Sequence, residues 1–185
     1  PEEALAFVRQ EIEGLKDLND SYSPLGPIRG VGWTGPSSLE KQLRAIFPDE
    51  SIALLHEEAA RLGALAEHHL NEDESSESMV FVDARRATNE VGCGIVLGGQ
   101  VHRGRGQAGR LLSDQRSLSD RLRCLRDTLD PELVVVRGDD KAAIDILIEE
   151  IQADGTPCRS SRFGRLAAAE GGAFLAWQGL VDSMV

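Results

Sequence analysis

The chain of 185 residues is poor in cysteine, in cationic side chains and in long apolar runs. Its three cysteines, Cys93, Cys124 and Cys158, lie far apart and form no CxxC pair, so neither a disulfide framework nor a cysteine zinc site is expected. Lys and Arg number 20 against 31 Asp and Glu, which gives a formal charge of −11. Each contact to a phosphate backbone needs an unopposed cation, and direct nucleic-acid binding by this chain is therefore not expected.

Membrane and export signals are also missing. The longest apolar runs, such as Leu133–Val136, are far shorter than a membrane span. The start Pro1-Glu2-Glu3 is acidic and lacks the apolar core of a signal peptide, and its first residue is not Met, as in a fragment of a longer protein. Because 41% of the residues are apolar, the chain can bury a sizeable core. We expect a globular, cytoplasmic protein.

Apolar spacing and turn residues divide the chain into helices and strands. The predicted helices cover residues 1–15, 39–47, 57–69, 117–129, 139–151 and 166–181. The predicted strands cover residues 28–33, 51–55, 79–84, 91–97 and 133–136, with one more short strand within 155–162. Strands first, and then helices and strands in alternation, predict an α/β layered fold.

A polar, acidic run at residues 71–78 has no apolar anchor and predicts a linker. It divides the chain into an N-terminal α/β region, residues 1–70, and a C-terminal region, residues 79–185.

Motifs for metal binding, nucleophilic catalysis and phosphate binding are all weak. His68 and His69 are adjacent, so on a helix they point about 100° apart and cannot share one ion. There is no GxSxG motif, and Cys93, between two glycines in a predicted strand, is interpreted as a small core residue. Residues 85–90, before Gly92, contain no glycine and include an acid that would repel a phosphate, although Arg85-Arg86 could attract an anion. We predict no metal site and no bound cofactor.

Four separated segments resemble, in the same order, motifs of the ROK family of bacterial sugar kinases and sugar-responsive repressors. Residues 91–104, VGCGIVLGGQVHRG, resemble the family's GxGxGIVLxGxLxRG segment. Residues 57–67 resemble the helix start ENDANAAALAE, residues 129–136 the strand LDPEVIVLGGG, and residues 166–176 the alanine- and glycine-rich C-terminal helix. The resemblance implies the actin-like, ribonuclease H-like fold of these sugar kinases, with two lobes around a cleft and a truncated N-terminal lobe.

The resemblance also implies where the catalytic residues would lie, and the decisive one is replaced. The family's Asp, which takes the proton from the sugar hydroxyl, corresponds to Ala59. A general base contributes about 10²–10⁴ to the rate, and alanine accepts no proton. The neighbouring sugar-binding Asn corresponds to Glu58, and a second Asn to Arg61. Glu57 or Glu58 could replace the base only from a position about 100–200° around the helix.

The other motifs of the family also differ. Its GExGH segment aligns with residues 109–113, GRLLS, and its GTGxG phosphate loop with residues 88–92, which lack the first two glycines. Arg137-Gly138-Asp139 stands where GGG would approach adenosine, and the DxGGT hairpin is absent. A leucine-striped segment, residues 117–129, replaces the structural zinc motif, whose contribution of about 10–16 kcal/mol its packing must offset. These losses together predict a non-catalytic protein, not an enzyme.

Three functions follow as hypotheses. The first is the effector and dimerisation domain of a ROK-type transcriptional regulator, a homodimer that binds DNA only through a winged helix-turn-helix preceding residue 1. Its small-molecule effector would contact Glu57, Glu58, Arg61, Arg110 and the Gly35-Pro36 turn, although Glu58 and Arg61 could equally form a surface ion pair. The alternatives are a divergent ATP-dependent sugar kinase and a structural pseudo-kinase with a protein partner.

Overall fold

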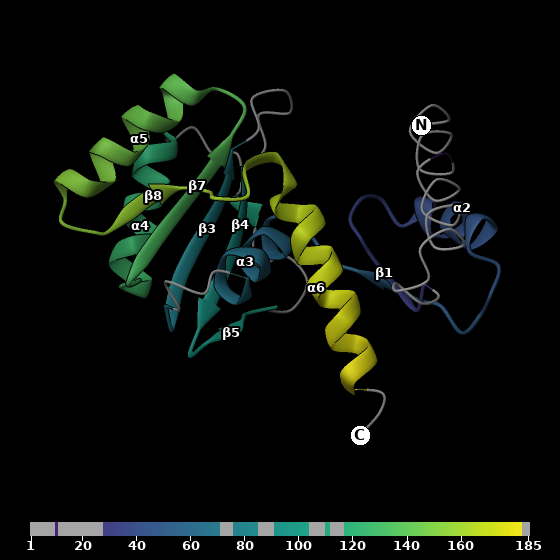
Figure 1. Cartoon of the computed structure of the whole chain (residues 1–185). Coiled ribbons are helices and arrows are strands. Elements are labelled where there is room, and N and C mark those ends of the chain that lie inside the picture. The colour runs from purple at the N-terminus through teal and green to yellow at the C-terminus, as the bar shows by residue number, and fades with distance from the viewer. Residues whose placement is uncertain are drawn as a thin grey trace.

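The protein was analysed as a computed structural model, which describes residues 10, 28–70, 76–84, 91–103, 110–111 and 117–182 (Figure 1). Except for Gln10, the predicted first helix lies outside the described residues, as do Arg85-Arg86 and residues 71–75 of the predicted linker. None of the helices in the described ranges is long and apolar enough to cross a bilayer.

The order of elements follows the alternation expected from the sequence. The strands are β1 Gly30–Trp33, β2 Ala53–His56, β3 Ser78–Ala84, β4 Val91–Leu97, β5 Gln100–Val101, β6 Arg110–Leu111, β7 Leu133–Gly138 and β8 Cys158–Ser160. The helices are α2 Ser38–Ile46, α3 Ala59–His69, α4 Leu118–Leu129, α5 Lys141–Ala153 and α6 Ala167–Asp182, the last preceded by a 3₁₀ turn, Gly164–Leu166.

The large sheet has the strand order β5-β4-β3-β7-β8, and β6 pairs with the far end of β4. Strands β3, β4 and β5 are antiparallel, while β7 and β8 run parallel to β3. A meander of three strands followed by two parallel strands is the arrangement of the ribonuclease H-like fold. The predicted fold class is therefore confirmed at the level of topology.

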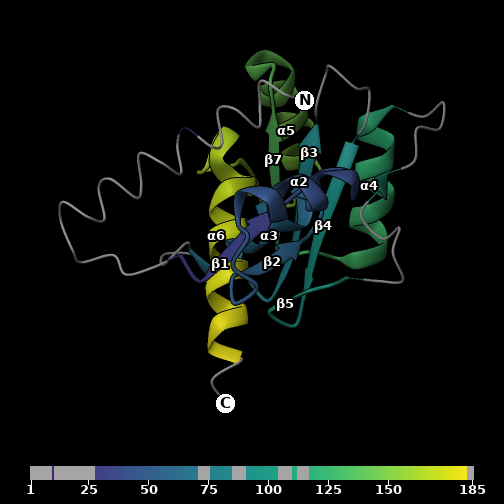
Figure 2. The same cartoon turned by 90° about the vertical axis from the view of Figure 1, so that its right-hand side faces the viewer.

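Helices cover both faces of this sheet, as Figure 2 shows for α6 and α4. On one face, Val80, Val82 and Val136 pack with residues of α4 and α5. On the other face, Phe81 and Val135 pack with residues of α3 and α6. Because β3 and β7 are buried on both faces, their sequences are continuous apolar runs and not alternating ones.

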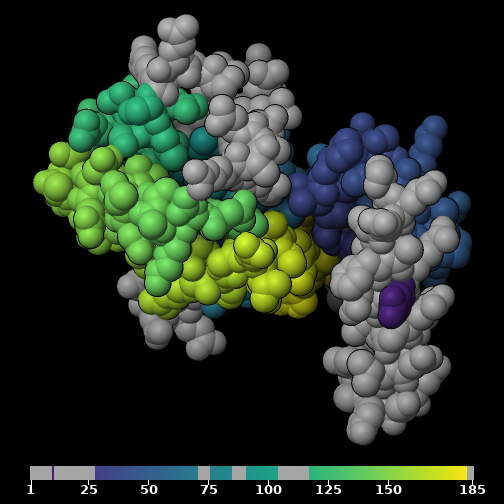
Figure 3. Space-filling view, turned by 90° about the horizontal axis from the view of Figure 1, so that it is seen from above, coloured from purple at the N-terminus to yellow at the C-terminus, as the bar shows by residue number. Residues whose placement is uncertain are grey.

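A smaller sheet consists of β1 and β2, which pair in parallel from Gly30 and Ala53 to Trp33 and His56. Trp33 packs on one side of it with Leu43 of α2 and with Phe47, which follows that helix. On the other side α6 approaches at backbone distance: a Cβ on Gly32 would lie 2.0 Å from the carbonyl oxygen of Gly172. In Figure 3, α6 lies between the blue residues of this N-terminal part and the green residues of α5.

Helices α3 and α6 join the two sheets. α3, which falls within the predicted N-terminal region, packs on β3 and β4 of the large sheet, and α6 packs on both α3 and β1. The division into residues 1–70, 71–78 and 79–185, with a truncated N-terminal lobe, stays a prediction.

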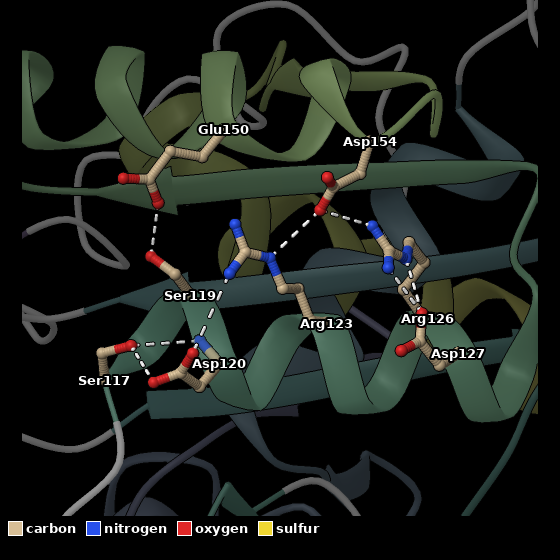
Figure 4. A network of polar contacts seen from close by, with 8 residues as sticks. All are labelled: Ser117, Ser119, Asp120, Arg123, Arg126, Asp127, Glu150 and Asp154. Carbon is tan, nitrogen blue, oxygen red and sulfur yellow. Dashed lines mark hydrogen bonds and ion pairs between the residues drawn. The ribbon is translucent and has the colours of Figure 1, made fainter.

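The leucine stripe of α4 packs as the sequence predicts. Leu122 is buried in the core under α4 and α5, and Leu118, Leu125 and Leu129 pack against that core. A polar network above it ties α4 to α5 (Figure 4): Arg123 and Arg126 both contact Asp154, at 3.1 and 2.7 Å. Ser119 is also hydrogen-bonded to Glu150, and together these contacts join α4 to α5.

The starts of α2 and α3 differ from the sequence predictions. α3 begins at Ala59 and not at Glu57, because Glu58 is the extended N-cap residue, with φ −71° and ψ 143°. Glu57 and Glu58 thus precede the helix, and the expected angular offset around it does not apply. α2 begins at Ser38 and not at Leu39, and the side chain of its N-cap residue, Ser37, makes no capping hydrogen bond.

Candidate functional site

Three of the predicted site residues, Glu57, Glu58 and Arg61, lie where β2 ends and α3 begins. Glu57 leaves the strand with its N–H donating to the carbonyl oxygen of Trp33 at 3.0 Å, which continues the β1–β2 pairing. This places the Glu57 carboxylate at the carboxyl end of two parallel strands and at the start of a helix. Ligands of α/β folds bind at such a place.

Glu57 is held between two guanidinium groups. Its Oε1 accepts a hydrogen bond from Arg61 Nη1 at 2.8 Å, and its Oε2 lies 3.1 Å from Arg103 Nε. Glu57 is only 7% exposed, whereas the Arg103 side chain is 65% exposed. One cation is therefore packed inside the protein with Glu57, and the other reaches the same carboxylate from the solvent side.

The remaining carboxylate of the predicted set, Glu58, is half-buried and does not cap the helix through its side chain. The alternative of a surface ion pair between Glu58 and Arg61 is wrong, because Arg61 is buried and forms an ion pair with Glu57. Ala59, at the position of the family's catalytic base, is the first residue of α3. The two residues directly before it are carboxylates, Glu57, which is engaged, and Glu58.

The remaining predicted residues are Arg110 and the Gly35-Pro36 turn. Arg110 is in β6, where it pairs with Gly92 of β4, and its side chain lies outside what the structure describes. Gly35 has φ +137°, which only glycine adopts readily, and its carbonyl oxygen lies 2.9 Å from Nε2 of His56. The Gly35-Pro36 turn is thus tied to the residue directly before Glu57.

Sequence reasoning missed Arg103 as a partner of Glu57. The two residues are far apart in the chain, and no local spacing relates them. The Glu57–Arg61 pair did have a signal, a Glu four residues before an Arg, which is the favourable order for a helical ion pair.

A second charged pair lies at the carboxyl ends of β3 and β7. Asp83 and Arg137 are in register on these strands, and Asp83 Oδ2 lies 3.5 Å from Arg137 Nη1. Next along the chain, Asp140 caps α5 by accepting from the N–H of Ala143 at 3.2 Å. A helix N-terminus at such a strand end can bind a phosphate. Here the helix is capped by a carboxylate of the chain itself.

A third carboxylate, Glu67, joins α3 to the segment after β8. It is almost fully buried and accepts from Ser161 Oγ at 2.6 Å, from the N–H of Arg162 at 2.9 Å and from Arg159 Nη1 at 2.8 Å. These contacts explain how an acid is accommodated on a helix whose neighbouring residues are small and buried. Sequence reasoning did not single out Glu67.

Cys93, His68 and His69, to which the sequence assigns no catalytic or metal-binding role, have structural contacts. Cys93 is buried, and burial raises the pKa of its thiol to about 12, so the interpretation as a small core residue is confirmed. His68 is hydrogen-bonded through Nε2 to the carbonyl oxygen of Gly99, and His69 stacks on Phe174. Within the described ranges, no group of three or more His, Cys, Asp or Glu side chains could hold a metal ion.

The comparison with solved structures identifies the fold, whereas no protein-family model and no curated protein matches the sequence. A ROK family transcriptional regulator, described as a homologue of the MLC protein of Escherichia coli, superposes with a TM-score of 0.67 and 16% identity, covering 98% of this chain and 69% of that one. A ROK family protein from Streptococcus pneumoniae in complex with sucrose has a TM-score of 0.66 and 12% identity, covering 98% and 87%.

A ROK hexokinase from Thermus thermophilus has a TM-score of 0.59 and 22% identity, covering 76% of this chain and 70% of that one. The chain therefore has the actin-like fold that ROK sugar kinases share with a ROK transcriptional regulator. The fold implied by the four sequence segments is confirmed, and both a kinase and a regulator are compatible with it.

Proposed function

We propose that this chain is a non-catalytic, ROK-type effector and dimerisation domain of a transcriptional regulator. The contacts of Glu57 carry the proposal. Both of its carboxylate oxygens are paired with cations, those of Arg61 and Arg103, and a carboxylate paired with two cations is a weak general base. Ala59, at the family's catalytic position, cannot take that proton either.

The strand ends that would face a nucleotide support the same proposal. The carboxylates of Asp83, Asp139 and Asp140 lie at or just beyond the ends of β3 and β7. The positive end of α5 is already satisfied by Asp140. Negative side chains at this place repel the negatively charged phosphates of a nucleotide. Because Asp140 already accepts from an N–H group at the start of α5, that group is not open to a phosphate.

The effector would be a small polar molecule bound at the start of α3. Glu57, Arg61 and Arg103 offer one carboxylate and two guanidinium groups, a set that pairs with hydroxyl groups as both acceptor and donor. Glu58 and Arg110 complete the predicted set. DNA would be contacted only by a winged helix-turn-helix preceding residue 1, consistent with the charge of −11 on this chain.

Isothermal titration calorimetry tests the non-catalytic part. Titration with Mg-ATP, alone and with each member of a hexose panel, is expected to give no heat of nucleotide binding and no ADP. Nucleotide binding together with phosphoryl transfer would contradict the proposal.

A thermal-shift screen with the same hexoses and their acids tests the effector. A ligand at 100 times its dissociation constant adds about 2.7 kcal/mol to stability. The shift should disappear in Arg103→Gln, whose exposed side chain can be changed without opening the core. If no member of the panel shifts the wild type, a structural pseudo-kinase with a protein partner is favoured.

A divergent sugar kinase is the second candidate, because Glu58 precedes α3 in an extended conformation beside the position of the lost base. Several of the matching structures are ROK kinases. In that case Glu58→Gln abolishes ADP formation from Mg-ATP and a hexose, whereas Glu149→Gln, on the exposed side of α5, does not.

A further inference from the structure

α6 is apolar on the side that faces away from the protein. Its inner side is buried against α3 and β1 through residues such as Gly171 and Leu175. Between Glu170 and Asp182 the sequence GGAFLAWQGLV contains no charged residue. A helix with only one covered side normally carries charges on the other, so this composition indicates a second covered side.

Four of the exposed residues of α6 form a stripe, which we call the α6 stripe: Ala169, Ala173, Trp177 and Val181. They recur every four residues, so they lie on one side of the helix. Gln178 and Asp182 are also exposed and lie beside the C-terminal half of the stripe. Trp177 is 58% exposed, although its ring contacts Phe174, which in turn stacks on His69 of α3. The C-terminal half of the stripe is therefore large and aromatic, and the N-terminal half is flat.

We propose that the α6 stripe is the surface through which two copies of this chain associate, with the two α6 helices antiparallel about a two-fold axis near Ala173. In such an isologous contact each large half meets the flat half of the other copy. Trp177 lies four residues after Ala173 and Ala169 four residues before it, so Trp177 of one copy faces Ala169 of the other. Val181, eight residues after Ala173, falls in the same register at Arg165, next to Leu166, which is 62% exposed.

Charge favours a second copy as the occupant. Each copy carries a charge of −11, and the outer sides of α4 and α5 expose acids such as Asp127, Asp145 and Glu149. Two copies approaching through those helices would repel each other. At the ends of the α6 pairing, in contrast, the exposed Asp182 of one copy falls near the exposed Arg165 of the other. The proposal specifies the surface for the dimerisation in the proposed function.

Light scattering after size exclusion, on the full chain, tests the contact. The wild type is expected to have twice the chain mass of 20.0 kDa. Ala173→Glu places two carboxylates at the axis and should reduce the mass to that of one chain, and Ala173→Lys should do the same. Mixing the two variants should restore the double mass, because opposite charges then meet at the axis.

Ile146→Glu is the matched control, since Ile146 is equally exposed, at 58%, but lies on α5. This variant should keep the mass of the wild type. If Ala173→Glu does not fold, Trp177→Gln takes its place and should also give single chains. A wild type that stays a single chain at the highest soluble concentration overturns the proposal, as does a dimer that survives both Ala173→Glu and Ala173→Lys. Either result leaves the expected absence of ATP binding unaffected.

Discussion

At the scale of single residues, the most consequential side chain is Glu57. It is buried with Arg61, and the pair is completed by Arg103 at the surface. The two arginines differ mainly in exposure, so substitutions can separate what the buried pair and the surface pair contribute.

Glu57→Gln should destabilise the protein by about 3–5 kcal/mol, because it removes the negative charge that is buried against the guanidinium of Arg61. Arg103→Gln, in contrast, should cost no more than about 1 kcal/mol, since an exposed pair contributes little. Urea unfolding of both variants measures the difference. Equal losses in the two variants would show that the Glu57–Arg61 pair does not behave as a buried one.

His69 should make stability depend on pH. Burial, and to a lesser extent the nearby His68, lower the pKa of His69 in the folded protein. The unfolded chain therefore binds the proton more readily, and the free energy of unfolding should fall as the pH drops through about 6.5. Unfolding midpoints between about pH 8 and pH 5 measure this slope.

The variant His69→Phe keeps an aromatic ring against Phe174 but cannot be protonated. Its unfolding midpoint should fall less steeply with decreasing pH than that of the wild type. An unchanged slope would assign the pH dependence to other groups.

At the scale of elements, the closest packing in the protein involves α6. A Cβ on Gly171 would lie 1.7 Å from the carbonyl oxygen of Leu62, a backbone atom of α3 that cannot turn aside. A Cβ on Gly179, in the same helix, would lie 2.7 Å from Cδ1 of Leu55, the end of a flexible side chain.

Gly171→Ala should therefore destabilise the protein by about 3 kcal/mol or more, because α3 and α6 must separate. Gly179→Ala should be close to neutral, since alanine gains up to about 1 kcal/mol in helix propensity against a small rearrangement of Leu55. Thermal unfolding of the two variants gives the comparison. Similar losses in both would mean that α6 shifts as a unit and that its contact with α3 is not tight.

The elements themselves were largely predictable from the sequence, and their contacts were not. Leu133–Val136 is a continuous apolar run because β7 is covered on both faces, and the helix predicted over residues 117–129 corresponds to α4, Leu118–Leu129. The pairing of Arg103 with Glu57 depends on where β5 ends relative to α3, which no local pattern encodes. Similarly, Asp83 meets Arg137 only through the register of two strands separated by more than fifty residues.

At the scale of the whole molecule, the charge of −11 should govern association. Two copies that meet through an uncharged stripe are still subject to the long-range repulsion of their other surfaces. Added salt screens this repulsion, with a Debye length of about 10 Å at 0.1 M and about 3 Å at 1 M.

The association of two copies should accordingly strengthen as NaCl is raised from about 0.02 M to about 0.5 M. Sedimentation velocity at several protein concentrations measures the dissociation constant at each salt concentration. A dissociation constant that rises with salt would indicate that ion pairs, and not the apolar stripe, hold the copies together.

The glycine contacts of α6 have a mechanical consequence. Gly32 of β1 and Gly172 of α6 touch through their main chains, and on its opposite side the same helix presents Trp177 to the surface. No long side chain lies between β1 and α6 at this point to absorb a small displacement. If an effector at the end of β1 displaces that strand, α6 must be displaced together with it. The bound molecule would then change the relative orientation of the two copies at the α6 stripe. Binding of the effector would in this way alter the dimer without any chemical reaction.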